Sequence, residues 1–240
     1  MFFDPLSITV MVITMVISGI AQFMVKSAYK KYSQVPSSAG MSGAEAAARM
    51  LRANGIAGVD IEQVQGMLSD HYDPTKKVLR LSPDVYHGTS LASLGVACHE
   101  AGHALQHARG YTPLYLRSIM VPVATFGTNA GVWLMLIGVL MGAASGVPGI
   151  GRYMALIGFV AFLGAVLFSI VTLPVEFDAS KRAKQQLAEL GILHSVEEQR
   201  GVAKVLNAAA MTYVAAAIVS LLYLLEWAIR LGLIGGRRDD

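Results

Sequence analysis

Charged residues and cysteines are both scarce in this sequence, and each scarcity narrows what the protein can be. Only 15% of the 240 residues are Asp, Glu, Lys or Arg, whereas a soluble domain carries about 25%. The single cysteine, Cys98, excludes an intrachain disulfide and is expected to be a small packing residue. Basic and aromatic residues do not form the pattern of a nucleic-acid-binding surface, so we expect no nucleic-acid partner.

The missing charges leave four apolar stretches that are long enough to cross a bilayer, which takes about 20 residues. These stretches cover residues 6–25, 119–144, 153–175 and 208–234, and the last continues past Glu226. The first lacks a basic n-region and a clear small-residue cleavage site, so we expect it to be retained as an anchor. The sequence therefore predicts a mainly α, multi-pass membrane protein with about four transmembrane helices and the lipid bilayer as a partner.

Helix signals are clear in two of the segments outside these stretches. A capping box at 42–45 predicts a helix over 43–54. After the third stretch, residues 176–190 are predicted as a helix, and a second capping box at 195–198 opens a helix that runs into the fourth stretch. We find no internal repeat and no low-complexity tail.

The remaining segments favour a connector and a little β structure. Residues 26–40 are basic and then rich in Ser, Gly and Pro, which is typical of a connector. Residues 59–64 and 77–81 are predicted as short strands, with a turn-rich segment at 70–74 between them. The parts outside the membrane are too small for two independent domains, so we expect one small α+β unit.

The resulting domain organisation has five parts. They are an N-terminal transmembrane anchor at 1–25, a linker and catalytic region at 26–118, a transmembrane helical hairpin at 119–175, cytoplasmic helices at 176–207, and a C-terminal transmembrane helix and tail at 208–240.

The sequence His99-Glu100-Ala101-Gly102-His103 is an H-E-x-x-H motif inside a predicted helix over 90–109. On a helix, residues four apart lie about 40° apart around the axis and roughly 6 Å apart along it. Both imidazoles can therefore hold one zinc ion, with Glu100 beside them as a base. The alternative is a surface helix with two incidental histidines, but the residues before the motif are small and apolar, which favours a buried helix.

A catalytic zinc site usually has three protein ligands, so the motif needs a third. His107 continues the histidine row but lies another turn along the helix, too far to share the ion. The metzincin pattern also fails, because Gln106 and Arg109 stand where it requires glycine and histidine.

Glu176 is the better candidate for the third ligand. Two membrane spans form a hairpin, so the chain returns at Glu176 to the membrane face where the motif helix ends. A carboxylate at that boundary needs a partner. The alternative is an ion pair of Glu176 with Lys181 or Arg182, and Asp178 is expected nearby, orienting a histidine.

His99–His103, the segment 70–74 and the segment 173–180 resemble the YugP-type neutral zinc metallopeptidases, which are bacterial membrane proteins. The resemblance covers nearly the whole chain. More remotely, the chain is similar to the HtpX and CAAX-prenyl endopeptidases, where a Glu-x-x-x-Asp pattern after a helical hairpin completes the zinc site. Glu176 matches that glutamate, while Ser180 stands at the aspartate position. The resemblance implies a zincin-like (gluzincin) unit with one Zn²⁺ per chain.

The function predicted from these residues is a zinc-dependent endopeptidase that acts on membrane-associated or unfolded proteins. His99, His103 and Glu176 are the predicted metal ligands and Glu100 the predicted base. One alternative is a non-catalytic membrane scaffold or assembly protein that retains a zinc site. Another is a site-2-type intramembrane protease, which the basic residue Arg109 after the motif disfavours. The sequence sets no expectation for the oligomeric state.

The sequence leaves alternatives open for the oxyanion donor and for the role of the strand 77–81. The donors that could stabilise the oxyanion are His71, Tyr72, His194 and Arg182, whereas His87 shows nothing beyond a loop histidine. The predicted strand 77–81 is either a sheet edge along which an extended substrate binds or an ordinary structural strand.

Basic residues near the span ends predict the orientation, because they favour the cytoplasmic side. About eight lie on the side of the H-E-x-x-H motif and four on the other, which places the active site in the cytoplasm and the N-terminus outside. The eight are Lys26, Lys30, Lys31, Arg109, Arg117, Lys181, Arg182 and Lys184, and the four include Arg152, Arg237 and Arg238.

Overall fold

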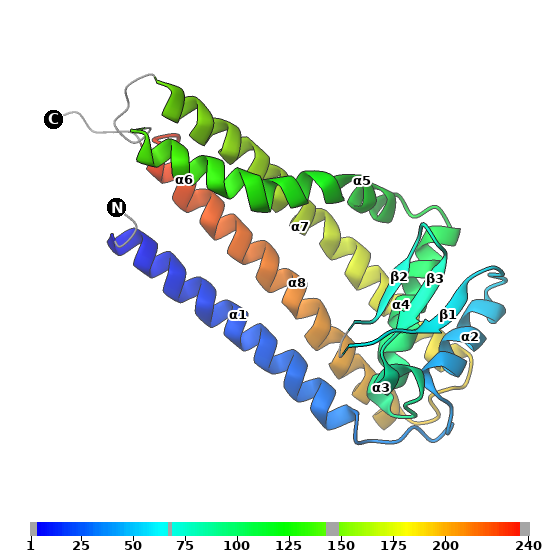
Figure 1. Cartoon of the computed structure of the whole chain (residues 1–240). Coiled ribbons are helices and arrows are strands. Elements are labelled where there is room, and N and C mark those ends of the chain that lie inside the picture. The colour runs from blue at the N-terminus through cyan, green and yellow to red at the C-terminus, as the bar shows by residue number, and fades with distance from the viewer. Residues whose placement is uncertain (1–3, 67–68, 143–148, 236–240) are drawn as a thin grey trace. The chain divides into compact units, whose positions relative to one another are not determined.

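A computed structural model describes residues 4–66, 69–142 and 149–235 of the chain. Within these ranges the chain is mainly helical and holds one small sheet, which confirms the predicted fold class. Two compact units are present, and three long helices contribute residues to both: α1 (Pro5–Tyr32), α7 (Ile150–Glu189) and α8 (Val196–Arg230) (Figure 1). Two parts of the prediction lie outside the described residues. They are residues 143–148 of the transmembrane hairpin and the tail residues Arg237 and Arg238.

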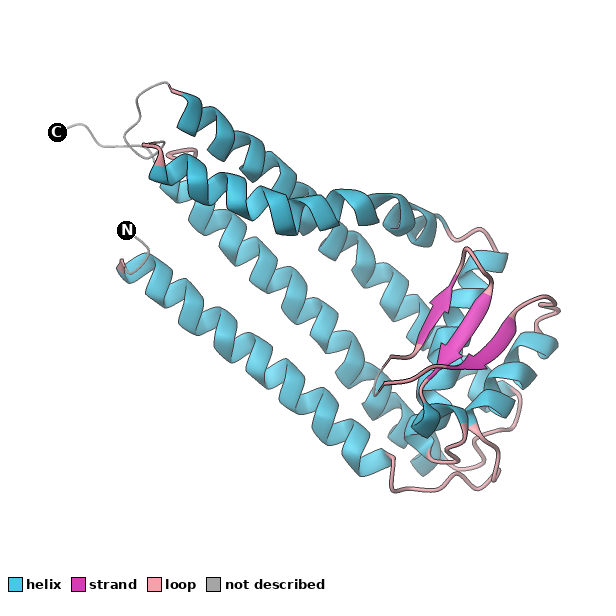
Figure 2. Cartoon of the chain, in the orientation of Figure 1, coloured by secondary structure: helices cyan, strands magenta, loops and turns pink. Residues whose placement is uncertain are grey.

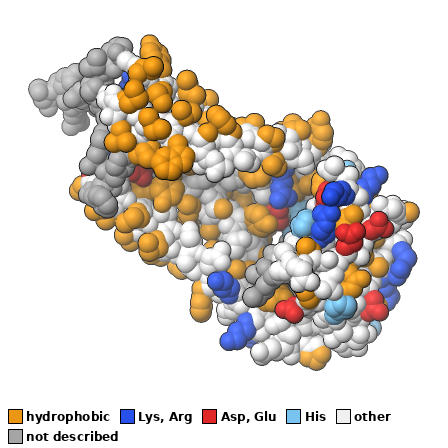
Figure 3. Space-filling model, in the orientation of Figure 1, with side chains coloured by type: hydrophobic (Ala, Val, Ile, Leu, Met, Phe, Trp, Pro, Cys, Tyr) orange, Lys and Arg blue, Asp and Glu red, His pale blue; other side chains and the backbone are white. Residues whose placement is uncertain are grey.

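The first unit consists of helices that can cross a membrane. It comprises Met1–Ile20, Leu116–Thr172 and Tyr213–Asp240, as far as these are described. By length and composition, α1, α7 and α8 are candidate spans, and so is the stretch Thr112–Leu140, which consists of α5 (Thr112–Phe126), the π-helical turn η1 (Gly127–Gly131) and α6 (Val132–Leu140). Hydrophobic side chains cover the visible face of this unit in Figure 3. Four candidate spans therefore stand where the sequence predicts four.

Small residues let the helices of this unit pack backbone against backbone. A Cβ atom on Gly127 or Gly138 would overlap backbone atoms of Ala161 or Gly151 on α7, and one on Gly158 would overlap the opposite helix in the same way. Close approach of this kind is how membrane helices gain van der Waals contact in the absence of a hydrophobic driving force between them.

The charges at one end of the first unit pair with one another. Arg230 of α8 donates to Glu226 at 3.0 Å and to Asp4 at 2.6 Å, and Ser7 of α1 donates to Glu226 at 2.5 Å. Glu226, the acid inside the fourth predicted stretch, is thus compensated within the protein, as a buried charge requires.

The second unit comprises Ala21–Tyr115 and Leu173–Thr212. It holds α2 (Gly43–Ala53), β1 (Asp60–Gln63), β2 (His71–Asp73), β3 (Val78–Leu81), α3 (Pro83–Tyr86) and α4 (Leu91–Ala108), together with the adjoining parts of α1, α7 and α8. Figure 2 shows the three strands beside the short helices, and charged side chains gather over this unit in Figure 3.

The order of the strands corrects two expectations. The sheet runs β1-β3-β2, with β3 parallel to β1 and antiparallel to β2. The strand predicted at 77–81 is therefore central and cannot be a free edge for substrate. The segment 70–74, expected to be a turn, contributes the third strand, because His71–Asp73 pairs with Val78–Arg80.

Three helix starts match their sequence signals. Ser42 and Glu45 form the capping box of α2, Ser90 accepts a hydrogen bond from the Ser93 N–H at the start of α4, and Ser195 caps α8. The connector predicted from residue 26 begins later than expected, since α1 continues to Tyr32. The lysines in the last turn of α1 interact favourably with the negative end of the helix dipole.

Small residues also determine where α4 lies. Ala97, Ala101 and Ala104 are buried in the core of the second unit. A Cβ atom on Gly102 would lie 2.7 Å from the carbonyl oxygen of Ala179, so α4 and this part of α7 are in direct backbone contact. This close approach brings the H-E-x-x-H motif against the stretch of α7 that begins at Glu176. Cys98 is fully buried, and burial raises its pKa to about 12, as befits a packing residue.

Candidate metal centre

His99 and His103 point to the same side of α4, toward Glu176 of α7. The Nε2 atom of His99 lies 3.2 Å from Oε2 of Glu176, and the Nε2 atom of His103 lies 3.8 Å from it. One ligand atom from each residue lies within 4.8 Å of the others. Glu176 is only 1% exposed and His103 only 7%. The three side chains therefore converge in the interior of one unit.

This donor set fits zinc. Imidazole nitrogens and a carboxylate oxygen are ordinary zinc ligands, with bonds of about 2.0–2.2 Å to a tetrahedral ion. Ligand atoms around such an ion are separated by roughly 3.3 Å. The distances of 3.2 and 3.8 Å between the histidine nitrogens and Glu176 are close to that separation. Arg182, one of the alternative partners considered for Glu176, pairs with Asp178 at 2.5 Å.

Both histidines are held from behind through Nδ1. The Nδ1 atom of His103 lies 3.0 Å from Oε1 of Gln106, and that of His99 lies 3.1 Å from Oγ of Ser180. Contacts of this kind orient an imidazole and leave Nε2 for a metal. Ser180 stands where the Glu-x-x-x-Asp pattern has its aspartate, and its hydroxyl lies beside His99. Asp178 accepts a hydrogen bond from Gln106, which in turn contacts His103.

Glu100 lies next to His99 and faces the edge strand β2. Its Oε2 atom accepts a hydrogen bond of 3.1 Å from the backbone N–H of Tyr72. Desolvation by the surrounding protein raises the pKa of Glu100 to about 7, and the carboxylates of Glu176 and Asp70 contribute in the same direction. The nearby His99 and the Tyr72 N–H work against this rise. A carboxyl group with such a pKa can both accept and release a proton near neutral pH.

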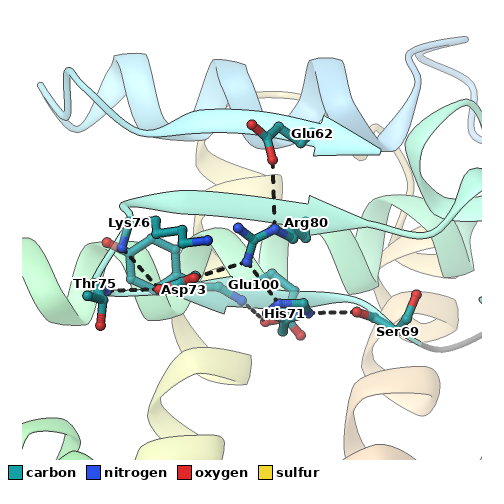
Figure 4. Close-up of polar contacts among 9 residues, drawn as sticks. Glu62, Ser69, His71, Asp73, Thr75, Lys76, Arg80 and Glu100 are labelled. Atoms are coloured by element: carbon teal, nitrogen blue, oxygen red, sulfur yellow. Dashed lines mark hydrogen bonds and ion pairs between the residues drawn. The ribbon is translucent and has the colours of Figure 1, made fainter. Parts of the chain in front are cut away.

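Strand β2 is fixed to its neighbour by the charged cluster drawn in Figure 4. Arg80 of β3 donates to Asp73 at 3.0 Å and lies 3.7 Å from Glu62 of β1. The Lys76 N–H and then Arg80 hold the pKa of Asp73 below its ordinary value. His71 belongs to this exposed cluster, with Nδ1 at 2.7 Å from the Ser69 carbonyl oxygen. The cluster steadies the strand that presents the Tyr72 N–H to Glu100.

Tyr72 lies along the motif helix. Its backbone contacts Glu100, and its hydroxyl lies 2.9 Å from Nδ1 of His107 two turns further on. Burial, and then the Asp73 carboxylate, raise the pKa of Tyr72, so its hydroxyl stays protonated at neutral pH. Of the oxyanion candidates, Tyr72 is the one in contact with Glu100, through its backbone N–H, whereas its hydroxyl is directed to His107.

The other candidate donors are engaged elsewhere. Arg182 pairs with Asp178 and lies 5.8 Å from the ring centre of Tyr111. The backbone N–H of His194 donates to Glu198 at the start of α8. The ring of His87 lies 2.9 Å from the side chain of Gln63. These contacts are all with residues other than Glu100 and the three convergent side chains.

The sequence analysis missed Gln106. This side chain is fully buried and touches His103, the Val175 carbonyl and Asp178. The one available signal was a polar residue three positions after His103 in an otherwise small and apolar helix segment, since a buried amide must be hydrogen-bonded.

The long apolar helices and the convergent H-E-x-x-H site define a class, the membrane-spanning zinc peptidases of the H-E-x-x-H type. A family model described as "Putative neutral zinc metallopeptidase" matches residues 7–232, and the chain belongs to this family. It is similar to the "Putative membrane protease YugP" of Bacillus subtilis (strain 168), at 48% identity over 207 residues, which cover 86% of this chain and 88% of that protein. The resemblance seen in the sequence is thereby confirmed. No solved structure matches the chain.

Proposed function

We propose that this protein is an integral-membrane zinc-dependent endopeptidase that cleaves membrane-associated or unfolded proteins. The observation that carries the proposal is the convergence of His99, His103 and Glu176 beside Glu100. The family supports a zinc peptidase with protein substrates. The catalytic unit in this proposal consists of residues 26–118 and 176–207, and the remaining segments form the membrane part.

Each residue of the site has a distinct task in the proposed reaction. His99, His103 and Glu176 would hold one Zn²⁺, which when bound supplies a Lewis acid and lowers the pKa of water. Glu100 takes a proton from the attacking water and returns it to the leaving amine. Its pKa near 7 suits both transfers.

Hydrolysis of a casein or peptide substrate by the purified, full-length protein tests the proposal. We expect cleavage inside the chain of the substrate, loss of activity with a zinc chelator, and recovery when zinc is added back. Cleavage that persists after complete zinc removal would contradict the mechanism. A zinc-loaded protein that cleaves no substrate in its native membrane would favour the alternative of a non-catalytic scaffold.

The site-2-type alternative requires the motif to lie within a membrane span. Among the described residues, the candidate spans are α1, the α5–α6 stretch, α7 and α8, whereas the motif lies on α4. We therefore propose a site outside the bilayer core, on the cytoplasmic side that the distribution of basic residues favours.

A further inference from the structure

Gln106 is a fully buried amide whose hydrogen bonds are all to groups near the metal centre. Its Oε1 atom lies 3.0 Å from Nδ1 of His103. Its Nε2 atom donates to the Val175 carbonyl at 2.8 Å and to Asp178 at 2.9 Å. Val175 and Asp178 lie on either side of Glu176 in the sequence. One side chain therefore connects His103 on α4 with the segment of α7 that carries the proposed third ligand.

The partners of Gln106 determine which way its amide points. A backbone carbonyl and a carboxylate can only accept hydrogen bonds, so both of their contacts require the NH₂ end of the amide. The carbonyl oxygen of Gln106 must then face His103, and an amide oxygen can only accept. It follows that Nδ1 of His103 carries a proton. In the neutral ring, Nε2, which lies 3.8 Å from Glu176, is then the nitrogen that can bind a metal.

The far end of this connection is also fixed. The Nε atom of Arg182 donates to the same Asp178 oxygen at 2.5 Å. Arg182 in turn lies 5.8 Å from the ring centre of Tyr111. Because Asp178 is held by a residue one turn along its own helix, it offers a rigid acceptor to Gln106.

His99 is held differently. Its Nδ1 atom contacts the hydroxyl of Ser180 at 3.1 Å, and a hydroxyl can either donate or accept. Ser180 therefore orients the ring of His99 without determining where its proton lies. The structure thus gives the two histidines unequal support.

We propose that Gln106 is a positioning residue that fixes His103 as the Nδ1-protonated tautomer and couples its ring to the Glu176 segment. The proposal rests on the proposed zinc site. Gln106 does not touch the reacting atoms; it acts through His103, and its loss leaves His103 free to present a protonated Nε2 to the metal.

Zinc affinity of the purified full-length protein, measured by competition with a chromogenic chelator, tests this role without any need for turnover. The first variant is Gln106→Met, which keeps the length of the side chain and removes the amide. The second is Gln106→Glu, whose carboxyl group has the same length, still offers an acceptor to Nδ1 of His103, and when protonated can donate to Asp178. Gln185→Met, on an exposed position of α7, is the matched control.

We expect Gln106→Met to weaken zinc binding by about 10- to 100-fold, the usual effect of removing an outer-shell partner of a metal-bound histidine. Gln106→Glu and the control should stay within about fivefold of the wild type, because the acceptor for Nδ1–H is retained. If Gln106→Met binds zinc like the wild type, or if Gln106→Glu is weakened as much as Gln106→Met, the positioning role is wrong. Failure of the wild type itself to bind zinc would instead refute the proposed function.

Discussion

Glu100 has the position and environment of a general base. It lies between His99 and the edge strand, and burial raises its pKa to about 7. We predict that Glu100→Gln retains zinc and loses about 10²–10⁴ in kcat, since the proposed ligands remain while the proton acceptor is gone. Kinetics with a peptide substrate, together with zinc analysis of the same preparation, measure both quantities. A variant with nearly normal kcat would refute the assigned role.

The pKa of Glu100 also predicts how the zinc-free protein responds to pH. Its pKa is raised from 4.5 to about 7, so between these values the folded state holds a proton that the unfolded chain releases. The contribution of Glu100 to stability therefore falls as the pH rises through this window. We predict that zinc-free Glu100→Gln is more stable than the zinc-free wild type at about pH 8 and that the difference shrinks toward pH 5. Thermal unfolding midpoints of the two proteins, recorded together, provide the test, and a difference independent of pH would contradict it.

The geometry around Glu176 predicts which residues bind the metal. His99→Ala, His103→Ala and Glu176→Ala should each lose zinc, because each removes one of three convergent ligand atoms. His107→Ala should keep zinc, since the ring of His107 is directed to the Tyr72 hydroxyl. Metal analysis of the four purified variants distinguishes these outcomes. A zinc-replete Glu176→Ala variant would mean that the third ligand is another residue.

At the scale of residues, most of what could be predicted about the site followed from the spacing of residues along the sequence. The i, i+4 spacing of His99 and His103 requires only a helix, and Glu176 follows from the return of a membrane hairpin. Contacts between Ser180 and His99, or between Gln106 and Asp178, join residues more than 70 positions apart. They depend on the rotation of α7 against α4, which no local pattern contains.

At the scale of elements, the sheet shows why strand order was harder to predict than helices. Strand β2 has only three residues, too few for a visible alternation of apolar and polar side chains. Its neighbours Asp70 and Pro74 indicate turns, and Asp70 does anchor the chain by accepting hydrogen bonds from Ser82. Strand β2 pairs with the second side of β3, which excludes a substrate edge at 77–81 and leaves the alternative of an ordinary structural strand.

The contact between α4 and α7 leads to a prediction for two glycines on the same helix. A Cβ atom on Gly102 would meet the backbone of Ala179 at 2.7 Å, whereas one on Gly95 would meet side chains, Val202 at 3.2 Å and Leu206 at 3.9 Å. Gly102→Ala should therefore push the helices apart, lowering both thermal stability and zinc affinity. Gly95→Ala should be neutral or stabilising, because alanine favours a helix over glycine by about 1 kcal/mol.

Thermal unfolding and chelator competition on these two variants compare identical chemical changes on one helix. Loss of zinc affinity in Gly102→Ala alone would support the close approach as a determinant of the site. Equal behaviour of the two variants would show that the backbone contact of Gly102 is unimportant.

At the scale of the whole molecule, hydropathy predicted the number of spans but not the length of the helices. The 40 residues of α7 extend for about 60 Å, twice the thickness of a hydrocarbon core of about 30 Å. The helix continues through Pro174, whose missing N–H and ring are tolerated in membrane helices when neighbouring groups compensate. The predicted end of the third span at residue 175 therefore lies within one continuous helix.

The long helices α1, α7 and α8 bear on the orientation of the chain in the membrane. Because each of them carries residues of both units, the basic residues along these helices bear on that orientation. Lys30 and Lys31 end α1, and Lys181 and Lys184 follow the apolar part of α7, whereas Arg152 stands at the opposite end of that helix. Basic residues near span ends favour the cytoplasm.

We therefore predict that Ser33 faces the cytoplasm and that Gly149 faces the outside. Single cysteines at these exposed positions, in a Cys98→Ala background, can be labelled with a membrane-impermeant maleimide on intact cells. Replacing the fully buried Cys98 removes the one competing thiol. Position 149 should react from outside, and position 33 only after the membrane is permeabilised. Reaction at position 33 in intact cells, with 149 protected, would invert the topology and place the proposed metal centre outside the cytoplasm.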